Sequence, residues 1–91
     1  DVEVVVLRMD RVPYVDQSGI YAMEDAIEDL QRQCVKVVFT DLHGQPRALF
    51  ERLNIVPRLV AQEYCFDNFQ DCAHWLEKFI IDHEDIAYGN E

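Results

Sequence analysis

The chain has 91 residues, of which 49% are hydrophobic and 29% charged, a balance typical of one small globular domain. Its 18 acidic and 8 basic residues give a net charge of −10, which disfavours binding to nucleic acid and to anionic lipid. No apolar run approaches the roughly 20 residues that span a bilayer, so we expect no direct membrane insertion. Three cysteines without C-x-x-C spacing favour reduced thiols over a disulfide scaffold.

The first half of the chain predicts a strand, a helix and a second strand. Residues 2–9 are almost continuously apolar and β-branched, as in a strand covered on both faces. Residues 17–33 change to a helical period with one strongly acidic face. The predicted core face of this helix consists of Ile20, Met23, Ala26, Ile27 and Leu30. Residues 35–41 predict the second strand.

A short helix is expected next. Pro46 suits its first position, the helix runs to about Leu53, and Asn54 is a natural stop. Residues 55–62 predict a loop, with at most one helical turn after Pro57.

The last predicted elements are a short edge strand over residues 64–66 and a helix that begins with a capping box, Asp67 to Gln70. The apolar stripe of this helix is predicted to consist of Phe69, Cys72, Ala73, Leu76, Phe79 and Ile80. Residues 82–91 lack a core pattern, so we assign residues 1–81 to the domain and expect residues 82–91 to form a frayed tail.

Alternation of strands and helices predicts an α/β fold with a parallel sheet and right-handed crossovers. An apolar parallel strand such as residues 2–9 should not form a bare edge, because it would template aggregation. No other part of the chain is predicted to lie beside it. We therefore expect that the sequence begins in the middle of a domain.

The turn Asp16-Gln17-Ser18-Gly19 is the first candidate site. It lies where a helix starts, and backbone N–H groups at such a position attract anions. A purely structural interpretation is favoured from the pattern alone: Asp16 caps the helix, and Gly19 permits close packing of strand and helix.

Other candidate chemistry is weaker. Cys72 and His74 point about 200° apart on a helix, so with Cys65 they do not predict a metal site. Asp41 and His43 follow a strand, but no nucleophile elbow accompanies Ser18. We therefore predict no catalytic residue, metal or cofactor.

The basic side chains are unevenly spread. Three arginines fall in one stretch of this acidic chain and could hold an anion or meet an acidic partner, although a solvated helix face is preferred. They are Arg47, Arg52 and Arg58.

Several motifs together resemble the middle of a STAS domain. They are Val5-Val6-Leu7-Arg8-Met9, Val12-Pro13, and Asp16-Gln17-Ser18-Gly19-Ile20 with Met23-Glu24. The later Leu42-His43-Gly44-Gln45-Pro46-Arg47 and residues 49–53 resemble the bacterial SulP version, the cytoplasmic C-terminal domain of anion transporters. The resemblance extends from about Val2 to Leu76.

This resemblance implies a mixed sheet with helices packed on one side, and an opening pair of strands and a helix ahead of Val2. In the related anti-sigma-factor antagonists, the residue after the Asp is a regulatory phosphoserine. Gln17 stands there in this chain and cannot accept a phosphate. The resemblance therefore implies a turn that keeps its shape without the phosphorylation switch.

The resemblance also implies a non-catalytic regulatory domain on the cytoplasmic side of the inner membrane, as part of an integral anion transporter. Its partner would be the transporter's own transmembrane domain or a cytosolic protein. Two alternatives stay open: a stand-alone anti-sigma factor antagonist, and a module that senses a nucleotide or an anion.

Overall fold

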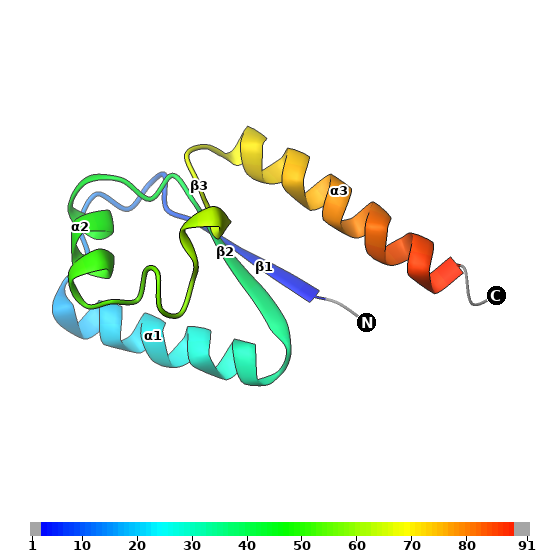
Figure 1. The fold of residues 1–91 in the computed structure, drawn as a ribbon. Helices are drawn as coiled ribbons and strands as arrows, with labels where there is room; N and C mark the ends of the chain where they lie inside the picture. Colours follow the sequence, from blue (N-terminus) through cyan, green and yellow to red (C-terminus); the bar gives the residue numbers. More distant parts are fainter. Residues whose placement is uncertain (1–2, 89–91) are drawn as a thin grey trace.

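A computed structural model describes residues 3–88 of the chain, and the side chains of residues 3–82. Figure 1 shows a small sheet with helices around it. In chain order the elements are β1 (Glu3–Arg8), α1 (Gln17–Arg32), β2 (Val35–Thr40), α2 (Gly44–Arg52), the 3-10 helix η1 (Gln62–Tyr64), β3 (Cys65–Phe66) and α3 (Phe69–Tyr88).

The sheet has three parallel strands in the order β1-β2-β3. The whole of β1 pairs with β2, from Glu3 opposite Val35 to Arg8 opposite Thr40. The short strand β3 pairs with the carboxyl end of β2. The predicted parallel α/β fold is confirmed, and residues 3–88 contain no antiparallel pair of the mixed sheet that the resemblance implied.

One face of the sheet carries the main hydrophobic core. From α1, Ile20 and Ile27 are 0% and 1% exposed, and they belong to the same cluster as Val37 and Phe39 of β2. The ring of Phe39 lies 5.1 Å from that of Phe50 on α2. The predicted core face of α1 is thus confirmed for Ile20 and Ile27, which are buried, and for Met23 and Leu30, which pack partly buried against the cluster. It is wrong for Ala26, which is exposed.

The other face of the sheet is covered by α3. Side chains alternate along a strand, so Val38 and Thr40 point away from α1, and both are 0% exposed. Arg8, which is paired with Thr40, lies over the ring of Phe69 at the start of α3. Figure 1 shows α1 and α3 on opposite sides of the strands.

The expectation that helices pack on one side therefore holds for α1 and α2 but not for α3. A central strand that is apolar on both faces must be covered on both, and in this chain α3 supplies the second cover. The aromatic contacts of Trp75 with Tyr64 and Phe66 hold it there, with ring centroids 5.7 and 5.6 Å apart.

Two helix starts differ from their predictions. The helix α2 begins at Gly44, and Pro46 is a buried residue of its first turn, where no intrahelical N–H bond is required. The N-terminal cap of α3 is Asn68 and not Asp67, because the Asn68 side chain accepts a hydrogen bond from the Asp71 N–H at 2.8 Å.

Two helix ends were also predicted. Asn54 follows the C-cap of α2 with a φ of 60°, so the predicted stop is confirmed. Of the tail predicted over residues 82–91, residues 82–88 continue α3. Neither Gly nor Pro interrupts α3, and its residues sustain the helix without a core pattern. Residues 89–91 lie outside the described residues.

The predicted stripe of α3 is only partly buried. Cys72 is 0% exposed, whereas Phe69 is 38% and Ile80 45% exposed. The sequence pattern did not single out Trp75, which packs against Tyr64 of η1 and Phe66 of β3.

We expect Ile27→Ala to lower the free energy of unfolding by about 2–5 kcal/mol, because it leaves a cavity between α1 and β2. Urea unfolding followed by circular dichroism measures the change. Asp25→Ala on the exposed face of α1 is the matched control and should change the midpoint little. Equal midpoints for Ile27→Ala and the parent chain would show that the assigned core face is wrong.

Within residues 3–88, β1 pairs on one side only, and its central residues Val4 to Leu7 are half-buried. We expect the 91-residue chain to associate through this edge as its concentration rises. Val4→Lys should reduce the association, since a lysine on an edge strand opposes further pairing. Sedimentation velocity measures it, with Gln70→Lys on the exposed face of α3 as a charge-matched control. A compact monomer at every concentration would contradict the expectation.

Candidate functional site

The turn Asp16–Gly19 forms the start of α1. Asp16 has extended backbone angles, φ −88° and ψ 171°, and its Oδ1 accepts a hydrogen bond from the Gly19 N–H at 2.7 Å. Its carbonyl accepts the first helical bond, from the Ile20 N–H at 3.0 Å. Asp16 is therefore the N-cap, as predicted, and the cap is made by its carboxylate.

Gln17 and Ser18 are exposed at the outer side of the turn. The Gln17 side-chain amide donates to the hydroxyl of Tyr21 one turn later, at 3.3 Å. Tyr21 is itself 49% exposed. The surface of the turn therefore consists of neutral polar groups around one carboxylate.

Gly19 keeps the cap free of crowding. A Cβ at this position would lie 3.1 Å from Asp16 Oδ1 and 3.5 Å from Val15 Cγ1. The expectation that Gly19 permits close packing of strand and helix is therefore wrong. The atoms that approach it belong to the turn itself, so the glycine serves the geometry of the cap.

A second element holds the turn from behind. The side-chain amide of Gln45, in the first turn of α2, contacts the main chain of Val15 twice. Gln45 Oε1 accepts from the Val15 N–H at 2.9 Å, and Gln45 Nε2 donates to the Val15 carbonyl at 2.9 Å. Sequence reasoning did not find this contact, which joins residues 30 positions apart.

An open groove of about 580 Å³ has Gln45 in its wall but no residue of the turn Asp16–Gly19. The loops that follow β1 and β2 form it, at the carboxyl ends of two parallel strands, where α/β proteins commonly bind ligands. Its walls include Asp10, Arg11, Asp41, His43 and Gln45.

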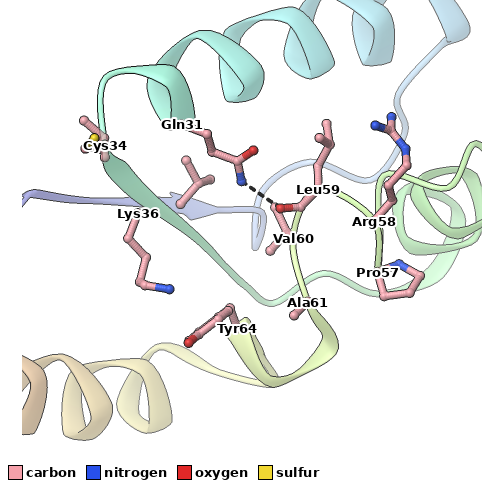
Figure 2. Close-up of a pocket in the computed structure, with 11 residues that line it drawn as sticks. Gln31, Cys34, Lys36, Pro57, Arg58, Leu59, Val60, Ala61 and Tyr64 are labelled. Carbon is pink, nitrogen blue, oxygen red and sulfur yellow. Dashed lines mark hydrogen bonds between the residues drawn. The ribbon is translucent and has the colours of Figure 1, made fainter.

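A different pocket, of about 360 Å³, lies near the far end of α1 (Figure 2). Gln31 closes one side by donating to the Leu59 carbonyl at 2.7 Å, and the Lys36 ammonium lies 3.8 Å from the Tyr64 ring centroid. Gln31 is near the C-terminus of α1, whereas the turn is at its N-terminus. This pocket is therefore not part of the candidate site.

The residues considered for metal binding do not converge. Cys72 is fully buried, His74 is exposed and Cys65 is half-buried. Burial raises the pKa of the Cys72 thiol. Burial also raises the pKa of the Cys65 thiol; the positive charge of Arg47 partly opposes this, and the negative charge of Glu51 adds to it. Among the described residues, no three His, Cys, Asp or Glu side chains could jointly hold a metal ion.

The ring of His43 contacts the carbonyl of Asp67 through Nε2 at 3.1 Å. Asp41 adopts a left-handed backbone with a φ of 59°, between β2 and this histidine. Gln45 thus contacts Val15 just before the turn, whereas the ring of His43 contacts Asp67 in the connection that precedes α3.

The three arginines differ from one another. Arg52 is exposed, as a solvated helix face requires. Arg47 instead donates to the Leu42 carbonyl, to Gln62 and to Glu51, so it ties α2 to its neighbours. Arg58 pairs with Glu24 of α1 at 2.7 Å. The preferred interpretation therefore holds for Arg52 alone.

Comparison with known proteins supports the fold. The family model of the STAS domain matches residues 1–72. The crystal structure of a sulfate transporter family protein from Wolinella succinogenes superposes with a TM-score of 0.78 at 20% sequence identity. The match covers 86% of this chain and 63% of that chain. No curated protein matches the sequence significantly.

The fold and the capped turn define a small α/β domain that presents a helix start at the carboxyl edge of a parallel sheet. The chain belongs to the STAS domain family. The resemblance seen in the sequence is thereby confirmed, as is the STAS-like α/β fold. None of the helices in residues 3–88 is long and apolar enough to span a membrane.

We expect Gly19→Val to displace the Asp16 carboxylate, because its Cβ would stand 3.1 Å from Oδ1. Losing the cap should cost about 0.5–2 kcal/mol of stability. Gln17→Ser, at an exposed position of the same turn, is the control and should fold as the parent does. Thermal unfolding of the three proteins gives the comparison. A Gly19→Val protein as stable as the parent would show that the turn tolerates a side chain there.

Proposed function

We propose that this domain is a non-catalytic regulatory module of a SulP-type anion transporter, on the cytoplasmic side of the inner membrane. The likeness of its fold to a sulfate transporter family protein is the observation that carries the proposal. Because the match covers 63% of that chain at 20% identity, the likeness by itself concerns the fold.

Gln17 separates this proposal from the alternative of a stand-alone anti-sigma factor antagonist. An antagonist of that kind needs a phosphoacceptor directly after the capping aspartate. Gln17 is exposed in that position and has no hydroxyl. The neighbouring Ser18 is also exposed, so a switch moved by one residue would be accessible to a kinase and detectable as phosphate on Ser18.

The proposed contact surface is the turn Asp16–Gly19, and its proposed partner is the membrane domain of the same transporter or a cytosolic protein. The turn suits this use because its shape is fixed from within by the cap, while Gln17 and Ser18 remain free to be covered. The remaining ligand candidates, a nucleotide or an anion, would meet Asp16 at the turn and a chain of net charge −10. That charge opposes both, so a protein contact is preferred.

Fractionation of the native cells tests the proposal. An antibody against the domain should detect a protein much longer than 91 residues that stays with carbonate-washed membranes. It should carry no phosphate on Ser18 by mass spectrometry. A soluble protein of about this length that copurifies with a kinase would support the antagonist instead.

A contact experiment completes this test. A photo-crosslinker at position 17 of the intact protein should link the turn to a peptide of the membrane domain or to a defined cytosolic partner. The same crosslinker at Gln70, which is exposed on α3, is the control. Equal yields from both positions would argue against the turn as the contact surface.

A further inference from the structure

Side chains at the start of α2 make hydrogen bonds to several other segments of the chain. Three of their side chains each reach a different segment. Gln45 holds Val15 before α1, Arg47 holds Gln62 in η1 at 2.8 Å, and His43 contacts the Asp67 carbonyl before α3. The start of α2 therefore contacts the residues that precede α1 and α3, and the 3-10 helix η1.

Among these contacts, the one from Gln45 consists of two hydrogen bonds to the main chain of a single residue, Val15. A glutamine amide offers an acceptor oxygen and a donor NH2 group, and the main chain of Val15 bonds to each of them at 2.9 Å. Val15 is 9% exposed as a residue, and both hydrogen bonds are partly buried, although Gln45 itself is exposed. Leaving either group without a partner would carry a desolvation cost.

The position of Val15 decides where Asp16 lies. The two residues are adjacent, and Asp16 carries the carboxylate that caps α1 through Gly19. A shift of the Val15 main chain would move the capping oxygen away from the Gly19 N–H. The start of α1 is thus placed by a side chain that belongs to α2.

We propose that Gln45 is the positioning residue of the turn Asp16–Gly19. The contact surface is then composite, made by the start of α1 and fixed by the start of α2. Gln45 also lines the groove of about 580 Å³, so one side chain both lines the groove and holds Val15, the residue before the turn. The use of this surface for a partner rests on the proposed function, whereas the positioning role does not.

Glutamate is the informative replacement. Gln45→Glu keeps an oxygen that accepts from the Val15 N–H, but its ionised carboxylate cannot donate to the Val15 carbonyl. At acidic pH the protonated carboxyl regains a donor and resembles the native amide. A positioning role through this pair of hydrogen bonds therefore predicts a pH-dependent defect in Gln45→Glu that Gln45→Ala does not share.

Hydrogen exchange of the purified intact protein, followed by mass spectrometry with fragmentation, tests the proposal. In Gln45→Ala, the segment over residues 15–19 should exchange about tenfold faster, as expected for the loss of one or two hydrogen bonds. The segment over β2 should keep its rate. In Gln45→Glu, the turn should exchange as fast as in Gln45→Ala at neutral pH, and more slowly than in Gln45→Ala at the same acidic pH. Comparing the two variants at one pH cancels the intrinsic exchange and any effect of pH on the capping carboxylate of Asp16, which both share.

Gln31→Ala is the matched control, because it removes a side-chain amide that donates to a main-chain carbonyl at the other end of α1. It should leave the turn unchanged. Unchanged exchange of residues 15–19 in Gln45→Ala would overturn the proposal. So would an equal rise in all segments, or a Gln45→Glu protein whose turn exchanges as fast as that of Gln45→Ala at acidic pH.

The two proposals can fail separately. The exchange measurement needs no partner, so it can succeed even if the protein is not part of a transporter. If both hold, the crosslink from position 17 to its partner should lose yield in Gln45→Ala and keep it in Gln31→Ala. A normal crosslink yield with a loosened turn would refute the use of the positioned turn in binding.

Discussion

The burial of β2 on both faces is the constraint on which the rest of the structure depends. Val37 and Phe39 face α1 and α2, Val38 and Thr40 face the side of α3, and these four residues are at most 3% exposed. A strand of this kind needs a neighbour on each edge and a layer on each face. The domain meets the requirement with β1, β3 and helices from both halves of the chain, so each element is placed by its relation to β2.

Parallel pairing then determines where the candidate site lies. Because β1 and β2 run in the same direction, the connections that leave them emerge at the same edge of the sheet. One connection becomes the turn before α1, and the other becomes the start of α2. Residues 30 positions apart, Val15 and Gln45, meet there. The groove lined by Gln45 follows from the same arrangement, since both connections line it.

The sequence predicted the features that depend on neighbouring residues. The Asp16 cap, the core face of α1 apart from the exposed Ala26, and the stop at Asn54 each follow from spacing within a few positions, and the structure confirms them. The contact of Gln45 with Val15 depends on the packing of two distant segments, which local spacing does not encode. The sequence also failed to predict how α3 packs against the second face of the sheet, because Trp75, which contacts Phe66 there, was not part of the predicted apolar stripe.

The geometry of the turn is independent of the side chain that follows the capping aspartate. Asp16 supplies the capping oxygen, Gly19 supplies the N–H and the space, and Val15 is held through its main chain by Gln45. None of these contacts uses the side chain of Gln17, whose amide reaches only the exposed Tyr21 hydroxyl. Chemistry at position 17 can therefore change while the shape of the turn persists. In this STAS domain the shape of the turn and the side chain after the capping aspartate therefore depend on different atoms.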